Sequence, residues 1–503
     1  MKRKISLFFC TLIALSFLSI SGCVQGKSCN EQSKNSTYEV SCELHEDKLT
    51  GREKVTFYNC YDNSFKVLKF NLFGNAFRKD AKFSPVSAQH YSRAYYNGVD
   101  YGEMTINKVF SESCDLEFSI CGQDQNVLEV CLKEEVFPEE SVAITIDFEL
   151  KLANVLARTG ITGRTINLGN FYPILCAVNE KGFYECLYYS HGDPFFSECA
   201  DYFVNFTCGA EYVVAGSGIL LEEKEQNGFK TSRYQAQNVR SFAMVLSKDF
   251  KVEQGKACGV DVKYYYYDDQ TPKKSLDYAL KSIEYFSNAF GEYPYKTYTV
   301  VQTGFLQGGM EYPTLVMISD SLEKAERGEV IVHETAHQWW QTVVGNNEIE
   351  YGFLDEGLAE YSVVLFYENH SEYGLSREQL IKISEQTFRV FCSVYDKVFG
   401  KIDTSMIRSL GEFTTEYEYV NIAYVKPCIM YDTLRKTTGD ERFFKAIKKY
   451  YAEYKFKNVQ PEHLMGVFEK IGADSNGFFE SFFNGKAIIW LTNKGKNDKL
   501  NKV

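Results

Sequence analysis

Histidine is scarce in this sequence, with only seven in 503 residues. Beyond residue 22 no apolar run is long enough to span a bilayer, and no two cysteines form a Cys-x-x-Cys pair of the kind that binds metal. We also find no internal repeat at the period of a solenoid. These absences argue against a membrane-spanning body, a Cys-x-x-Cys metal site and a repeat architecture.

Positive charge is also in deficit. The chain has 55 Lys and Arg residues against 67 Asp and Glu, a formal net charge of −12. Nucleic acid binding depends on neutralising phosphates with basic side chains, so this balance argues against a nucleic acid partner. With 45% hydrophobic side chains the chain is globular, and its length suits two or three domains.

The first residues form a recognisable export pattern. Lys2-Arg3-Lys4 precede an apolar run from Ile5 to Leu18, and small residues stand just before Cys23. This order is typical of a bacterial lipoprotein signal. It predicts that residues 1–22 are removed, that Cys23 is lipidated, and that the protein is extracytoplasmic and anchored to a bacterial membrane. An uncleaved signal anchor is the alternative.

Fifteen cysteines are present, which is many for a chain with no Cys-x-x-Cys pair. If Cys10 is removed with the signal peptide and Cys23 carries lipid, an odd number of cysteines remains. At least one thiol is then unpaired within the chain. An exported setting permits disulfides, but buried free cysteines are an equally ordinary interpretation. The sequence does not assign them any chemistry.

The pattern of apolar residues changes along the chain. Residues 23–36 are polar and read as a tether, whereas residues 37–250 contain short alternating runs such as Ile144–Leu152, which predict an antiparallel β-sandwich domain. Residues 251–495 are predicted to form a second, mainly helical domain, with a strand at 297–303 before a Gly308-Gly309 turn, and residues 496–503 a polar tail. The helices are expected at 272–290, 328–344, 355–367, 377–393, 424–437, 440–455 and 462–471.

Two of the seven histidines stand four residues apart. In the run from Val330 to Trp339, a helix would stack His333 and His337 on one face, where two imidazoles can share one zinc ion, with Glu334 beside them. A helix with two separately partnered histidines is the alternative.

Glu356 is the candidate third zinc ligand. It lies nineteen residues after His337 on a second predicted helix, which completes a His₂Glu set. A surface carboxylate is the alternative at this position. Glu360, one turn further on, is a candidate to orient a ligand imidazole, although a solvated carboxylate is as good an interpretation. The three ligands and Glu334 as general base predict hydrolysis of a carbonyl compound by zinc-activated water.

Several stretches of the chain resemble the aminopeptidase N family of gluzincin zinc metallopeptidases, which also contains the leukotriene hydrolases. The resemblance spans nearly the whole mature chain. It rests on Gly308–Tyr312, His333–Trp339, Asp355–Ala359, Tyr424–Pro427, and Asn170–Pro173 together with Gly192–Tyr202.

The resemblance implies how a substrate is held. In that family the glutamate at the place of Glu311 binds the free α-amino group, so the enzyme removes the first residue of a peptide. Taken alone, Glu311 would be interpreted as a solvated loop residue. The backbone of Gly308 and Gly309 is expected to line the bound peptide like an added strand. Tyr312 departs from the family pattern, which has asparagine there.

Tyr424 aligns with the family tyrosine that donates its hydroxyl to the oxyanion. Pro427 replaces a family glycine in the same stretch, and Tyr417, Tyr419 and Tyr431 are rival donors nearby. Half-buried tyrosines usually only pack, so the resemblance carries this assignment.

The resemblance therefore implies an N-terminal β-sandwich followed by a thermolysin-like α/β domain, one zinc ion per chain, and substrates that are peptides with a free N-terminus. The family's C-terminal cap is expected to be missing, which would leave the cleft more open. The alternatives are a zinc endopeptidase, a surface peptide-binding or adhesion protein with the same fold, and, more remotely, epoxide hydrolysis of a lipid.

Overall fold

The computed structural model describes residues 35–112, 114–400, 402–472 and 477–485. The predicted signal peptide, the lipidation site Cys23, nearly all of the tether and the polar tail 496–503 lie outside the described residues. No helix within the described ranges combines the length and the apolar character that a membrane span requires.

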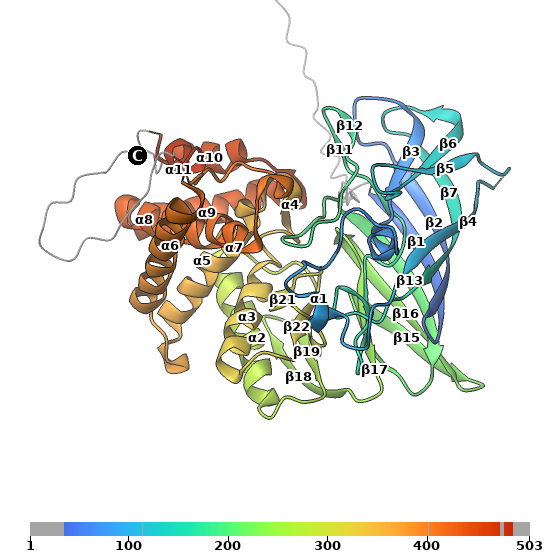
Figure 1. Cartoon of the computed structure of the whole chain (residues 1–503), viewed down its shortest axis with the longest axis horizontal. Helices are drawn as coiled ribbons and strands as arrows, with labels where there is room; N and C mark the ends of the chain where they lie inside the picture. The colour runs from blue at the N-terminus through green and yellow to red at the C-terminus, as the bar shows by residue number, and fades with distance from the viewer. Residues whose placement is uncertain (1–34, 113, 401, 473–476, 486–503) are drawn as a thin grey trace, which may run out of the picture. The chain divides into compact units, whose positions relative to one another are not determined.

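A seven-stranded sheet dominates the N-terminal region (Figure 1). In β1 buried and exposed residues alternate, which is the period of a strand with one face in the core. Neighbouring strands are antiparallel except β1 and β13, which run parallel. In sheet order the strands are β15 (Ile219–Gln226), β16 (Phe229–Val239), β13 (Ala200–Gly209), β1 (Ser36–His45), β2 (Lys48–Tyr58), β7 (Ser141–Lys151) and β4 (Glu103–Phe110).

Two four-stranded sheets and small elements complete this region. Leu49 and Ile146 of the large sheet and Phe70 of β3 are fully buried in one apolar cluster, and the mainly β character predicted for the first half of the chain is confirmed. One sheet is β10 (Ile174–Leu175), β3 (Phe65–Asn71), β6 (Val127–Val136) and β5 (Phe118–Cys121); the other is β14 (Val213–Gly216), β17 (Ala243–Ser247), β9 (Ile166–Gly169) and β8 (Thr159–Ile161). The small elements are η1 (Phe73–Phe77), α1 (Tyr91–Ala94), β11 (Val178–Asn179) and β12 (Gly182–Phe183).

A mixed five-stranded sheet follows. Its order is β18 (Lys251–Ala257), β19 (Val260–Tyr266), β20 (Thr297–Thr303), β22 (Leu315–Ser319) and β21 (Gly309–Met310). The predicted strand at 297–303 is therefore β20. The short strand β21 runs antiparallel to β22 at one edge, so its outer side is available for another extended backbone.

The predicted helices are present together with short ones that were not predicted, and one predicted helix differs clearly in its bounds. The helix predicted at 328–344 is α3, which begins earlier and ends at Ala336; the chain then turns, and Gln341 has a positive φ of 121°. The helices are α2 (Pro272–Ala289), α3 (Lys324–Ala336), α4 (Glu348–Tyr351), α5 (Phe353–Asn369), α6 (Arg377–Phe399), α7 (Glu416–Val420), a π-helix (Asn421–Val425), α8 (Lys426–Thr438), α9 (Asp440–Tyr454), α10 (Pro461–Lys470) and α11 (Phe478–Phe483). Shorter elements are η2 (Ser371–Tyr373), η3 (Leu410–Glu412), β23 (Val344–Asn346) and β24 (Lys457–Val459).

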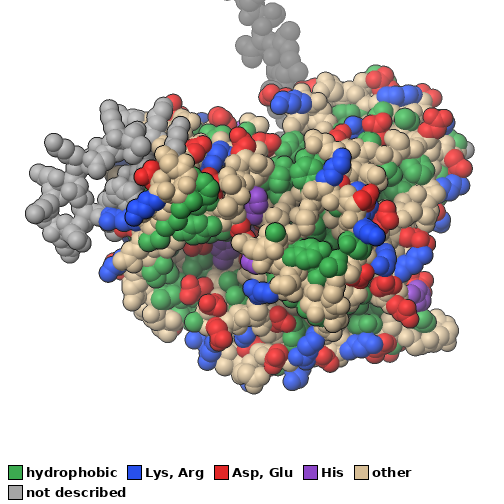
Figure 2. Space-filling view, in the orientation of Figure 1, with side chains coloured by type: hydrophobic (Ala, Val, Ile, Leu, Met, Phe, Trp, Pro, Cys, Tyr) green, Lys and Arg blue, Asp and Glu red, His purple; other side chains and the backbone are tan. Residues whose placement is uncertain are grey.

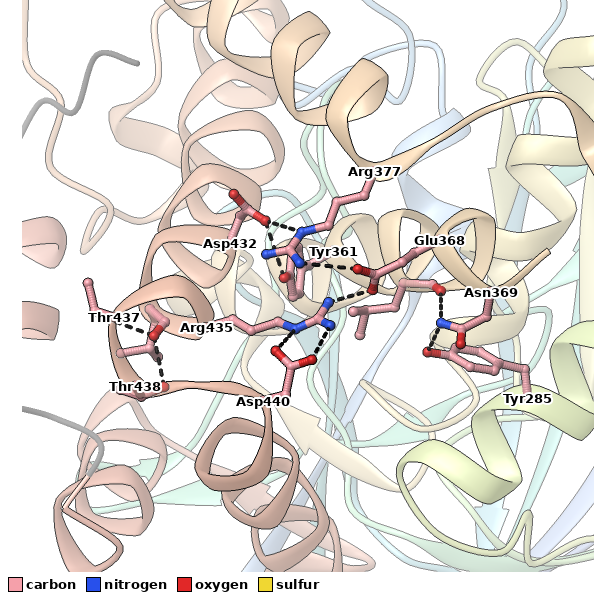
Figure 3. Close-up of polar contacts among 12 residues, drawn as sticks. Tyr285, Tyr361, Glu368, Asn369, Arg377, Asp432, Arg435, Thr437, Thr438 and Asp440 are labelled. Carbon is pink, nitrogen blue, oxygen red and sulfur yellow. Dashed lines mark hydrogen bonds and ion pairs between the residues drawn. The ribbon is translucent and has the colours of Figure 1, made fainter. Parts of the chain in front are cut away.

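An ion-pair network ties the helices together (Figure 3). Arg377 at the start of α6 donates to Asp432 of α8 at 2.8 Å and to Glu368 of α5 at 3.1 Å. Arg435 of α8 bonds both Glu368 and Asp440 of α9. Because each carboxylate meets a planar guanidinium, this network fixes four helices relative to one another.

Arg240 connects the N-terminal β region to the helical part. Its guanidinium donates to the backbone carbonyls of Ser197, Gln341 and Lys457 at 2.8 to 2.9 Å. The side chain lies so close to Gly345 that a Cβ there would be 2.0 Å from the guanidinium carbon. Glycine at position 345 is therefore what allows this contact.

Several cysteines pack as apolar residues. The buried free cysteines are Cys42, Cys176, Cys186, Cys208, Cys392 and Cys428. Burial raises the pKa of the Cys42 thiol, so it stays protonated and unreactive.

Candidate metal centre and active site

Helix α3 carries the two histidines. A capping box between Glu323 and Glu326 closes its first turn, and His337 lies one residue beyond its last helical residue. The helical geometry brings the Nε2 atoms of His333 and His337 to 3.0 Å from each other. Two ring nitrogens this close need a cation or a proton between them.

Glu356 comes from α5 and completes a triad. Its Oε2 lies 3.2 Å from Nε2 of His333 and 3.1 Å from Nε2 of His337. Burial alone would raise the pKa of Glu356, but the two imidazoles hold it below its usual range. The three sequence-predicted ligand residues thus converge with their ligand atoms in one place.

The remaining ring nitrogens are already engaged. Nδ1 of His333 lies 3.2 Å from Oε2 of Glu360, and Nδ1 of His337 lies 3.0 Å from the carbonyl oxygen of Trp340. These contacts turn the Nε2 lone pairs of both rings toward Glu356. Two imidazoles and one carboxylate, each oriented by a further group, fit the ligand set of a catalytic zinc ion.

A second acidic group lies beside this triad. Glu311, His337 and Asp355 also have ligand atoms within 4.8 Å of one another. However, Asp355 accepts a hydrogen bond from Asn346 at 2.9 Å, and both nitrogens of His337 are used in the first set. The triad with Glu356 is therefore the better metal site.

Glu334 is buried and points into the same cavity. It is 5% exposed, and its Oε2 has no hydrogen-bond partner among the described residues. Burial raises the pKa of this carboxyl, which suits a general base. The side chain packs on the backbone of β21, where a Cβ on Gly309 would be only 2.3 Å from Oε1 of Glu334.

Glu311 follows β21 directly, and its carboxylate lies near His337. It is 4% exposed, and its Oε1 has no partner among the described residues. Burial, together with the nearby Asp193, raises the pKa of Glu311 well above its usual range. Such a carboxyl is poised to receive a cationic group.

The structure adds Arg158 and Asp193, which sequence reasoning did not assign. Both come from the N-terminal region and line the cavity. Arg158 forms a buried ion pair with Asp193, and it also donates to the carbonyl of Gly192 at 3.1 Å and to the sulfur of Met310 at 3.0 Å. The available signal was the stretch from Gly192, which carried part of the family resemblance but no proposed role.

Tyr312 points away from the cavity. Its hydroxyl donates to Oδ1 of Asn170 at 2.7 Å, and it approaches Gly169 so closely that a Cβ there would lie 2.0 Å from the oxygen. The departure from the family's asparagine therefore anchors the Glu311 segment to the N-terminal region.

Tyr424 lies in the π-helix between α7 and α8. Its hydroxyl donates to Oε1 of Glu356, and its ring stacks on His333 with centroids 5.9 Å apart. Burial and the charge of Glu356 raise the pKa of Tyr424, so the hydroxyl keeps its proton. Of the rivals, Tyr417 is 44% exposed, and Tyr431 is fully buried and absent from the cavity wall.

Tyr419 is the rival that remains, because it lines the cavity 5.8 Å from the ring of Tyr424. The proline at position 427, where the family pattern has glycine, is also explained by its local packing. It opens α8 and packs against Gly357 of α5, where a Cβ would be 2.5 Å from the proline ring.

One cavity of about 470 Å³ is lined by the metal triad and by Arg158, Asp193, Glu311, Glu334, Glu360, Tyr419 and Tyr424. Histidine side chains are visible inside a hollow of the molecular surface (Figure 2). Gly308 and Gly309 form part of its wall. The cavity is large enough for a short peptide segment.

Comparison with known proteins matches this site to a family. Residues 274–484 match the family model described as "Peptidase family M1 domain". The chain carries a peptidase family M1 domain. This match confirms the family that the sequence motifs predicted, and the M1 domain contains the metal triad, Glu334, Glu311 and Tyr424.

Individual relatives agree with this assignment. The chain is 24% identical over 279 residues to aminopeptidase M1-B of Oryza sativa subsp. japonica, covering 52% of this chain and 31% of that one. It is 27% identical over 231 residues to aminopeptidase B of Rattus norvegicus, covering 41% and 32%. The chain thus spans about a third of the length of these curated relatives.

Among solved structures, a point mutant of an M1 zinc metallopeptidase from Deinococcus radiodurans, bound to a Tyr-Ser-Ala substrate, matches with a TM-score of 0.63. The identity is 16%, over 91% of this chain and 96% of that one. At this identity the likeness shows the fold, and it confirms the predicted β region followed by a mainly helical peptidase domain. That neighbour is named as a zinc metallopeptidase.

Proposed function

We propose that this chain is a zinc aminopeptidase that binds one zinc ion and hydrolyses the first peptide bond of peptides with a free N-terminus. The observation that carries the proposal is the buried carboxylate of Glu311, in the same cavity as the metal triad. No lysine or arginine among the described residues forms an ion pair with it. Arg158, which lines the same cavity, is paired with Asp193 instead. Burial penalises the ionised form of Glu311, and a cation beside it would offset that penalty; the α-ammonium of a peptide supplies one.

The position of this ammonium would determine which peptide bond lies at the metal. Glu311, with Asp193 nearby, would hold the amine beside His337, one of the three metal ligands. A charge-assisted hydrogen bond at a fixed distance from the reacting carbonyl admits one residue before the scissile bond.

Zinc held by His333, His337 and Glu356 would supply a Lewis acid that polarises the scissile carbonyl and lowers the pKa of water. Glu334 takes the proton from the attacking water and later passes it to the leaving amine. The Tyr424 hydroxyl, held protonated by burial, donates a hydrogen bond to the oxyanion of the tetrahedral intermediate. Gly308 and Gly309 offer the outer edge of β21 to the peptide backbone.

The names of the rice and rat relatives support exopeptidase action, and the bound tripeptide of the Deinococcus structure supports a peptide substrate. An endopeptidase would have no use for a buried carboxylate at the position of Glu311. No feature of the site favours the alternative of a non-catalytic peptide-binding protein.

A panel of aminoacyl fluorogenic amides, assayed with and without a chelator, tests the proposal. We expect turnover that chelation abolishes and zinc restores, and a Glu334→Gln variant that keeps its zinc but loses activity. An N-acetylated peptide should resist cleavage beside its free-amine twin. Equal cleavage of both would refute the role of Glu311, and zinc-independent turnover would refute the metal mechanism.

We also propose that the protein is exported and held at a bacterial membrane through lipid on Cys23. The support is the order of basic, apolar and small residues before this cysteine. Replacing Cys23 by alanine should release the protein from the membrane fraction, whereas Cys29→Ala should not. A Cys23→Ala protein that stays in the membrane would favour an uncleaved anchor instead.

A further inference from the structure

Carboxylates of the cavity wall lie beside each of the two imidazoles of the metal triad, and we take these two places as the ends of the cavity. At one end Glu311 lies beside His337, with ligand atoms within 4.8 Å of each other, and Asp193 lines the same cavity. At the other end Glu360 contacts His333, and Glu329 lies near Glu360. If the substrate amine occupies the first end and the scissile carbonyl lies at the triad, the chain after the scissile bond enters the second end.

At this second end, Glu329 is a carboxylate that no described residue neutralises. It lies four residues before His333 on α3, and therefore on the same helical face, one turn away. Glu360 is engaged by His333, whereas Glu329 has no ion pair or hydrogen bond with any described residue. Half-burial and the neighbouring Glu360 raise the pKa of Glu329, so a cation beside it would be stabilised.

The walls around Glu329 are apolar. Val330 follows it on α3, Val363 and Val364 of α5 are buried, and Leu380 of α6 faces the same space. A long aliphatic stem can pack against these side chains while a charged end reaches the carboxylate. Among the described residues, Glu311 and Glu334 each keep a buried oxygen without a hydrogen-bond partner in this cavity, which marks the cavity as a whole as a ligand site.

We propose that this end of the cavity is a subsite for a basic side chain, and that Glu329 selects lysine or arginine as the residue after the scissile bond. This inference rests on the proposed aminopeptidase function and adds a substrate class to it. Norleucine, which has the stem of lysine without its charge, should fill the same walls but leave Glu329 unpaired.

Three tripeptides that differ only at the second position test the subsite, with lysine, norleucine or glutamate there and one common first residue. We expect kcat/KM for the lysine peptide to exceed that for the norleucine peptide by about tenfold, as for one partly desolvated ion pair. The glutamate peptide should be the poorest. Raising the salt concentration should reduce the lysine preference, because screening weakens partly exposed pairs.

Two variants locate the preference. In Glu329→Gln the ratio of lysine to norleucine should fall to near one, and in Glu329→Lys the glutamate peptide should become the better substrate. Glu326→Gln is the matched control: it neutralises an exposed charge on the same helix and keeps the capping box, so the wild-type ratio should persist.

The outcomes separate the inference from the function on which it rests. An aminoacyl amide has no second residue, so its hydrolysis reports the aminopeptidase alone. If the amide is hydrolysed but the wild-type ratio is near one, or if Glu329→Gln retains the preference, the subsite is refuted and the function stands. If neither the amide nor any peptide loses its first residue, both fail.

Discussion

Tyr424→Phe gives the sharpest test of the site, because it removes one oxygen atom. The hydroxyl donates to Glu356, and the ring stacks on His333, so the phenylalanine ring should keep its position. Loss of one oxyanion donor typically reduces kcat by roughly 10² to 10³-fold, about 3–4 kcal/mol. KM should change little, because the donor acts mainly in the transition state.

The assay must separate catalysis from metal binding. Since the Tyr424 hydroxyl also contacts a metal ligand, its loss is expected to weaken zinc binding, so kcat is measured at saturating zinc with the bound metal counted. Tyr419→Phe is the matched control, as this tyrosine lines the same cavity. If Tyr424→Phe retains kcat within about threefold at equal zinc content, well short of the loss expected for an oxyanion donor, the assignment is wrong. A loss confined to Tyr419→Phe would transfer the role to that residue.

Three further predictions concern the supporting structure. Tyr312→Phe leaves the buried oxygen of Asn170 without its donor and should lower the free energy of unfolding by about 1–3 kcal/mol in urea denaturation, while raising KM for free-amine peptides; an unchanged midpoint would contradict this. Burial lowers the pKa of Lys426 to about 7, so between pH 7 and 10 the unfolded chain binds a proton that the folded chain lacks, and stability should rise with pH by up to about 1.4 kcal/mol per unit. Lys426→Met should lose this slope, and parallel pH curves for the two proteins would refute it. Gly309→Ala should displace Glu334 and reduce kcat by about 10²-fold at unchanged zinc content, whereas a Cβ on Gly308 meets nothing closer than 3.3 Å and Gly308→Ala should be nearly silent.

The metal triad could be anticipated from the sequence because helix geometry alone brings His333 and His337 together. Their spacing of four residues needs no tertiary information. Glu356 required the assumption that a second helix crosses the first, which the apolar and small residues around it suggested. Roles such as those of Glu311 and Tyr424 came only from the family resemblance.

Other parts of the site could not be predicted because they depend on contacts between distant segments. Arg158 reaches Met310, 152 positions away, and pairs with Asp193 across the cavity wall. Neither residue stands in a pattern that periodicity detects. The end of α3 at Ala336 was also missed, because the apolar residues of the following turn continue a helical spacing while their backbone does not.

The same kind of contact gives Tyr312, which stands where the family pattern has asparagine, a place outside the cavity. Residue 312 follows Glu311 directly; its side chain bonds Asn170, whereas the Glu311 side chain lines the cavity. A tyrosine there is long enough to reach Asn170 in the N-terminal region, and Gly169 leaves room for its hydroxyl. The segment that carries Glu311 is therefore held from the β region as well as from β22. In the proposed function, the distance between Glu311 and the metal triad sets which peptide bond is cut. A weaker link to the β region should therefore first widen the range of bonds that are cut, and only a larger disturbance should abolish cleavage.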